Sequence, residues 1–190
     1  VMPTLIFLDG SGNEVDRIIG YLPPEQYQAK VAEIEANINT LGACLQKYGN
    51  GERTAPLLFT MAQKYTDRNE SDMAIKYYAE LLELFPELDE RMASTARFEL
   101  AYDQFKNGNM DPFNEFINTF STSPMAQQAL SLMARFYKGS DNKVSELRVY
   151  ARMLELYPND PRTLNGYAWR MSEMELNLED ALVKARYAVA

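Results

Sequence analysis

The residues that could carry out redox or acid–base chemistry are few in this chain. Cys44 is the only cysteine and histidine is absent. The sequence therefore excludes intramolecular disulfides, Cys/His zinc sites, histidine general bases and two-cysteine redox centres. Cys44 lies in an apolar helical register with Leu41 and Leu45. We interpret it as a small core residue, with a reactive thiol as the alternative.

Carboxylate groups cluster at four places, and solvated surfaces explain them better than catalysis does. Three clusters have spacings typical of an exposed helix surface. The fourth resembles a calcium loop but lacks the ligand spacing and the terminal bidentate glutamate. The clusters are Glu33 with Glu35, Glu80 with Glu83, Glu87 with Asp89 and Glu90, and the segment Asp9-Gly10-Ser11-Gly12-Asn13-Glu14. We expect no metal, no cofactor and no reaction from this chain alone.

The composition narrows the class of partner. The net charge of −8 repels nucleic acid and anionic membrane surfaces, so we expect neither as a partner. No apolar run approaches the roughly 18 residues that span a bilayer, and no signal peptide opens the chain. The chain starts inside a strand-like run and stops inside a helical one, so we interpret it as a fragment.

Two stretches of the chain repeat each other. Residues 61–65 return as residues 133–137, and residues 82–86 return as residues 154–158, an offset of 133 − 61 = 72 in both cases. Pro124 lies between the two matched prolines, Pro86 and Pro158, so the repeating unit has about 36 residues. Such a unit buries its apolar face only against a neighbouring unit.

From residue 55 onward the apolar spacing predicts helices only. Ser71 or Asp72 is expected as the N-cap of the second helix, and Pro86 ends that helix. The fourth pair begins at Pro161. The earlier predicted helices span residues 56–65 and 71–85, 91–105 and 112–120, and 126–137 and 144–157.

Small and aromatic residues at matched positions resemble tetratricopeptide (TPR) repeats. The match is good in the first and third units, partial in the fourth and weak in the second; the generic alternative is an irregular helical bundle. The matched residues are Ala62, Ala134 and Ala168 on first helices, Ala74 and Ala181 on second helices, and Tyr65, Tyr78, Tyr137 and Tyr150. The resemblance implies a mainly α fold, a TPR-like α-solenoid that binds a protein or peptide partner along its first helices.

The resemblance also implies which residues face that peptide groove. Trp169 directly follows Ala168, the alanine that packs the fourth unit. The alternative interpretation is that Trp169 packs into the core at the C-terminal end of the solenoid. The lysine and asparagine pattern that clamps a C-terminal carboxylate in chaperone-binding members is not present, so such an adaptor is disfavoured. The candidates are Phe59, Gln63, Gln128, Ser131, Arg135, Arg162, Asn165 and Trp169.

The N-terminal segment has a different pattern. An apolar run over residues 4–8 and a second run over residues 14–19 predict two strands joined by a glycine-containing turn. Pro24 suits the first turn of a helix. Apolar residues then keep one helical face to about residue 48, and this predicts a single long helix.

The order Pro3-Thr4, hairpin and Gly20-Tyr21 resembles the second half of a thioredoxin fold. The resemblance implies residues 1–48 as half of a thioredoxin-like domain, residues 53–190 as about 3.5 TPR-like units, and Pro3 as the cis-proline beside a redox centre. The half with two cysteines is missing. The alternative function is therefore the C-terminal part of a bacterial thiol-disulfide oxidoreductase, periplasmic or cytoplasmic, with its active site and any signal peptide upstream.

The predicted hairpin is too small to be stable alone. Ile6, Leu8, Ile18 and Ile19 cannot all be covered by one helix, so we expect either the repeats or a second copy of the chain to shield them. A homodimer through the hairpin is the second of these alternatives.

Overall fold

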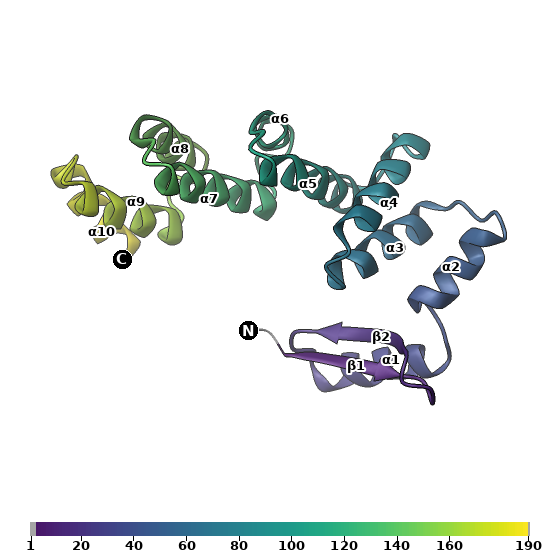
Figure 1. Ribbon diagram of the computed structural model, residues 1–190. Coiled ribbons are helices and arrows are strands. Elements are labelled where there is room, and N and C mark those ends of the chain that lie inside the picture. The colour runs from purple at the N-terminus through teal and green to yellow at the C-terminus, as the bar shows by residue number, and fades with distance from the viewer. Residues whose placement is uncertain (1–2, 190) are drawn as a thin grey trace. The chain divides into compact units, whose positions relative to one another are not determined.

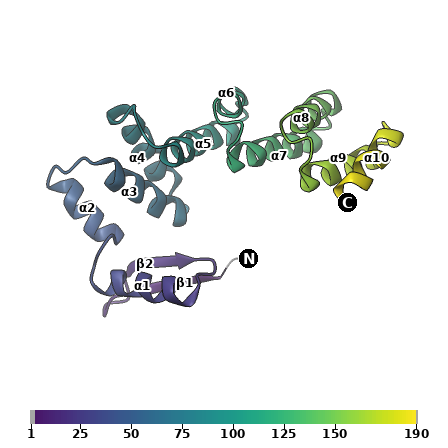
Figure 2. The same cartoon turned by 180° about the vertical axis from the view of Figure 1, so that it is seen from behind.

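The computed structural model describes residues 3–189, which form two strands followed by ten helices. The chain divides into two compact units, residues 1–103 and residues 104–190, and each unit is described separately below. The domain boundary expected between residues 48 and 53 stays a prediction. The elements are drawn in Figure 1, and Figure 2 shows them from behind.

The chain begins with the predicted β-hairpin. Strands β1 (Thr4–Leu8) and β2 (Glu14–Ile19) pair antiparallel, with Leu5 opposite Ile18 and an irregularity between Phe7 and Leu8. The carboxylate of Asp9 accepts the backbone N–H groups of Ser11 at 2.8 Å and Asn13 at 2.9 Å. The acidic segment is therefore an ordinary turn, in which the first carboxylate is used by the backbone.

The single helix predicted from Pro24 to about residue 48 is wrong. Two helices replace it, α1 (Pro24–Glu35) and α2 (Leu41–Gly49). Asn37 and Asn39 both have a φ of 54° in the link between them, a conformation that asparagine tolerates better than most residues. Thr40 then caps α2 by accepting the Ala43 N–H at 3.2 Å.

Helices α3 (Ala55–Asp67) and α4 (Ser71–Leu84) form the first helical hairpin, as predicted. The expected N-cap of α4 is wrong: Glu70 occupies that position without a side-chain hydrogen bond. Large and small apolar side chains from both helices, together with Cys44, form one core. Its fully buried members include Leu58, Met61, Ala62, Tyr78 and Leu81.

Helices α5 (Glu90–Lys106) and α6 (Asp111–Thr119) are the predicted second pair. The division between the two compact units falls within α5. At the C-terminal end of α5, the ring of Phe105 stacks against Phe113 of α6 with centroids 5.0 Å apart. This contact joins the end of α5 to α6 in the second unit.

The second unit continues with two further helical hairpins. They consist of α7 (Pro124–Gly139) with α8 (Lys143–Leu156), and α9 (Pro161–Met174) with α10 (Leu178–Ala188). Ser123, Asn142 and Asp160 cap three of these helices by accepting backbone N–H groups. Both pairs match the predicted third and fourth units, and both views show them as hairpins (Figures 1 and 2).

Candidate functional site

The predicted groove residues lie in both compact units. Phe59 and Gln63 belong to α3 in the first unit, and the other six belong to α7 and α9 in the second. Phe59 is only 3% exposed, with its ring against Tyr78 and the Arg91 guanidinium 5.0 Å from the ring centroid. It is therefore a core residue in this structure and is not available to a ligand. Gln63 is exposed.

In the second unit, the first helices α7 and α9 lie side by side and run in the same direction. Near their N-terminal ends, the Gln127 amide donates to Asp160 at 2.6 Å and to Thr163 at 3.0 Å. Near their C-terminal ends, Lys138 forms an ion pair with Glu173 at 2.8 Å. Polar contacts at both ends therefore fix the two helices parallel to each other.

The exposed candidate residues of the parallel helices α7 and α9 are together called the first-helix face. Trp169 is 69% exposed, so its alternative position in the core is not found. Its indole N–H donates to Glu173 at 3.1 Å, which orients the ring on the surface. The first-helix face consists of Gln128, Ser131 and Arg135 from α7 and Arg162, Asn165 and Trp169 from α9, all of them exposed.

Glu173 is the central charge beside this face. It accepts from Lys138, from Arg170 at 3.0 Å and from Trp169. Hydrogen bonds from Lys138 and then Arg170 lower the pKa of the Glu173 carboxyl to about 2, against a smaller opposing effect of desolvation. Glu173 is consequently an anion throughout the physiological range.

A buried ion pair between α8 and α9 was not predicted. Glu146 is 1% exposed, and its two carboxylate oxygens accept from the Arg170 guanidinium at 2.6 and 2.8 Å. Such bidentate geometry is strong and orients both partners. In the sequence, helical spacing places Glu146 on the buried side of its helix. The sequence does not identify Arg170 as the partner.

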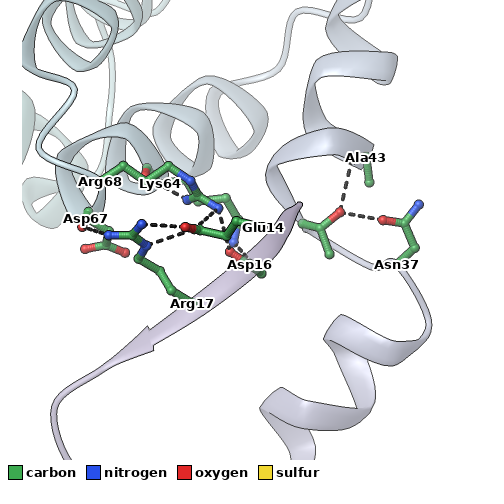
Figure 3. Close-up of polar contacts among 9 residues, drawn as sticks. Glu14, Asp16, Arg17, Asn37, Ala43, Lys64, Asp67 and Arg68 are labelled. Atoms are coloured by element: carbon green, nitrogen blue, oxygen red, sulfur yellow. Dashed lines mark hydrogen bonds and ion pairs between the residues drawn. The ribbon is translucent and has the colours of Figure 1, made fainter. Parts of the chain in front are cut away.

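A second unpredicted cluster joins the hairpin to the first helical pair (Figure 3). Asp16 of β2, which is 1% exposed, binds Lys64 of α3 at 2.6 Å. Arg68 reaches Asp16 at 3.5 Å and Glu14 at 2.9 Å. Arg17 also binds Glu14 and donates to the Asp67 carbonyl oxygen at 2.9 Å. These contacts position β2 against the C-terminal half of α3.

Of the two residues considered for redox chemistry, the structure describes the surroundings of Cys44 but not the peptide bond that precedes Pro3. Cys44 is a free, buried thiol whose pKa is raised by desolvation. The cis-proline expected at Pro3 depends on the Met2–Pro3 bond, and Met2 lies outside the described residues.

Two structural findings concern membranes and metals. Among residues 3–189, no helix combines the length and apolar character needed to cross a membrane. The same residues contain no group of three or more cysteine, aspartate or glutamate side chains placed to hold a metal ion.

The sequence matches no family model and no curated protein. Among solved structures, the chain is similar to the one titled "Crystal structure of MamA", with a TM-score of 0.58 and 13% sequence identity over 89% of this chain and 94% of that chain. At this identity the likeness concerns the fold alone. It confirms the predicted fold class, a mainly helical, TPR-like arrangement of helical hairpins, and gives no support to a thioredoxin-like parent.

Proposed function

We propose that the chain is a non-catalytic protein-interaction module whose first-helix face binds a peptide segment of a partner protein. The observation that carries the proposal is the parallel placement of α7 and α9 by polar contacts at both of their ends. Arg135 of α7 and Arg162 of α9 are both exposed, and the parallel placement of the two helices supports a single surface that includes both. Mostly polar residues surround a single large aromatic side chain there.

The chemistry of the first-helix face suits peptide recognition. Arginine and tryptophan are enriched among residues that dominate binding energy. Glutamine, serine and asparagine supply donors and acceptors without a fixed charge. Because Arg135 and Arg162 are exposed, the face itself favours a ligand with carboxylate groups and one apolar anchor for Trp169. This local charge differs from the chain's net charge of −8, which alone favours a neutral or basic ligand.

Selection from a library of random 12-residue peptides displayed on phage, against the immobilised full chain, tests this function. We expect enriched peptides to lose about tenfold or more in affinity with Arg135→Ala or Trp169→Ala. Two matched controls should leave binding unchanged: Arg148→Ala, an exposed arginine on α8, and Tyr187→Ala, which is 69% exposed like Trp169 but lies on α10. The proposal fails if no peptide is enriched, or if enriched peptides bind all four variants equally.

The homodimer through the hairpin stays a prediction, and one observation favours it. Ile6 and Leu8 of β1 are 52% and 60% exposed, although Ile18 of β2 is buried. A strand with apolar side chains and an unpaired edge is a template for another strand. We expect sedimentation to show self-association that weakens with Ile6→Lys; sedimentation as a monomer at every concentration would contradict the homodimer.

The oxidoreductase alternative has no supporting observation in the described residues. Thiol exchange needs an attacking thiolate and a second sulfur, and Cys44 is single and buried. We therefore propose no catalytic activity for this chain.

A further inference from the structure

Two stripes of exposed side chains run along α7 and α9 with the same spacing. The stripe on α7 consists of Gln128, Ser131, Arg135 and Lys138, and the stripe on α9 of Arg162, Asn165, Trp169 and Ser172. Steps of 3, 4 and 3 residues keep each stripe on one side of its helix. The stripes coincide at an offset of 162 − 128 = 34, and the buried Ala134 and Ala168 have the same offset. Equivalent positions of the two helices are therefore exposed.

Polar contacts between α7 and α9 fix which of their residues lie level with each other. The Gln127 amide donates to Asp160 and to Thr163, at offsets of 160 − 127 = 33 and 163 − 127 = 36. Lys138 pairs with Glu173, at an offset of 173 − 138 = 35. These values bracket 34. Because the helices are parallel, equivalent residues of the two stripes lie side by side.

This register places two arginines at opposite corners of a square. Arg135 lies level with Trp169, and Arg162 precedes Trp169 by 169 − 162 = 7 residues on α9, which is about 10 Å along a helix. The axes of packed helices are also about 10 Å apart. The diagonal from Arg135 to Arg162 is therefore about 14 Å. Ser131 and Asn165 lie near its midpoint, and Trp169 lies beside that midpoint.

Both arginines are available to an anionic ligand. Within residues 3–189, neither Arg135 nor Arg162 forms an ion pair. The carboxylate of Asp160, two residues before Arg162, is already bound by a backbone N–H and by a glutamine amide. The carboxylate of Glu173 accepts from three other donors. The carboxylates of α9 that flank the face are therefore used within the protein.

We propose that the first-helix face binds an extended acidic peptide in which two carboxylates, four residues apart, flank a central apolar side chain. An extended chain rises about 3.3 Å per residue, so four residues span about 13 Å, close to the length of the diagonal. The same period places the two acidic side chains and the central one on one side of the peptide. The carboxylates then meet Arg135 and Arg162, and the central side chain meets Trp169.

The middle of the diagonal suits an extended backbone better than a helix. Two carboxylates four residues apart on a helix are only about 6 Å apart, and helical backbone groups are already paired. The exposed Asn165 amide makes no side-chain hydrogen bond within residues 3–189. The Ser131 hydroxyl donates to the Gln127 carbonyl oxygen at 2.8 Å and can still accept. Both side chains can therefore bind the N–H and C=O groups of an extended peptide.

The net charge of the chain limits the ligand to a short acidic segment. Arginine binds phosphate as well as carboxylate, so a nucleic acid strand is the other anion to consider. The net charge of −8 opposes a long polyanion. Two carboxylates, in contrast, are matched by the two local guanidinium groups. This inference rests on the proposed function and specifies the class of peptide that the first-helix face binds.

A nine-residue peptide with capped ends provides the probe. It carries aspartate at its third and seventh positions, leucine at its fifth, and threonine elsewhere, because threonine favours extended backbone. Trp169 is the only tryptophan in the chain, so its fluorescence reports binding at the face, and calorimetry measures the affinity independently. Two peptides of the same composition keep the central leucine and place the aspartates two or six residues apart, at about 7 or 20 Å.

We expect saturable binding of the first peptide to the full chain, and binding about tenfold or more weaker for both altered spacings. Arg135→Gln and Arg162→Gln should each weaken the first peptide about tenfold or more. Each should also remove most of the preference for this spacing, which a general loss of positive charge would not do. The matched control is Arg148→Gln, at an exposed arginine of α8, which should leave both the affinity and the preference unchanged.

Three results would overturn the proposal. These are equal affinity for the three spacings, unchanged affinity in both arginine variants, or displacement of the peptide by an equal concentration of a nine-nucleotide single strand at physiological salt, which would assign the arginines to phosphate. The proposed function can survive each of them. If library peptides bind the first-helix face without paired acidic residues, peptide recognition stands and only this ligand class is wrong. If no library peptide is enriched and the designed peptide does not bind, both proposals fail.

Discussion

Asp16 of β2 and Lys64 of α3 form a buried ion pair at 2.6 Å between segments 48 residues apart. The side chains are 1% and 9% exposed. Burying two charges is costly unless each is paired and hydrogen-bonded. The pair therefore makes the position of the hairpin against α3 specific, although it adds less to stability than an apolar contact of the same size would.

We expect Asp16→Ala to lower the free energy of unfolding by about 3–5 kcal/mol, because Lys64 would remain buried without its carboxylate partner. Asp16→Leu combined with Lys64→Met should recover most of this loss. Lys30→Met, which breaks a partly exposed pair with Glu33, is the control and should change stability by less than about 1 kcal/mol. Urea denaturation measures all three. If Asp16→Ala lowers the free energy of unfolding no more than the control does, the Asp16–Lys64 ion pair is not formed in solution.

Ala62 and Ala134 mark close approaches of helices. Both are buried on the first helix of a pair, and we expect replacement of either by leucine to cost about 1–3 kcal/mol. Ala79→Leu, at an exposed position on α4, is the control. Thermal unfolding should show a lower midpoint for the two buried variants only; midpoints equal to wild type would argue against the repeat register.

Cys44 should be unreactive in the native protein. The thiol is buried, and desolvation raises its pKa, so the reactive thiolate is less populated than in an exposed cysteine at the same pH. We expect slow reaction with a disulfide reagent in buffer and fast reaction in urea. Reduction of insulin by this chain, abolished by Cys44→Ser, would contradict this prediction.

The Glu173 carboxyl should titrate far below an ordinary glutamate. Its pKa is about 2 because Lys138 and Arg170 donate to the ionised form. The stability linked to this shift is present above the unfolded-state pKa and is lost as the pH falls through the folded-state pKa. We expect an NMR titration to show the low value, Lys138→Met to raise it, and Arg152→Met, which breaks a pair with Glu155, to leave it unchanged. An ordinary glutamate pKa in wild type would contradict the contact.

Helical periodicity predicted most of the fold. It failed at the link between α1 and α2, because the apolar spacing continues through that link. Ile38, Leu41 and Leu45 keep the spacing of the preceding helix, so the sequence indicated one helix where there are two. The sequence did contain a local signal for the end of one helix and the start of the next. Asn37 and Asn39 favour left-handed backbone, and Thr40 is a good N-cap.

The repeat resemblance predicted exposed positions correctly for most of the candidate residues, but it failed at one position within the well-matched first unit. It assigned Arg135 and Trp169 to exposed positions on α7 and α9, but it also assigned Phe59, which is buried beside Tyr78. The resemblance gives a position within a repeat and does not show which neighbours cover it. The Asp16–Lys64 and Glu146–Arg170 pairs were missed because a sequence does not show which distant charges meet.

The most direct test of the protein-interaction account is an amide chemical-shift map of the full chain during titration with a library-selected peptide. We expect the largest shifts at residues of the first-helix face, including Ser131, Arg135, Asn165 and the indole N–H of Trp169. Tyr187→Ala should leave this pattern unchanged, and Arg135→Ala should reduce it. Shifts confined to other surfaces, with none at α7 and α9, would contradict the assignment of the first-helix face as the binding surface.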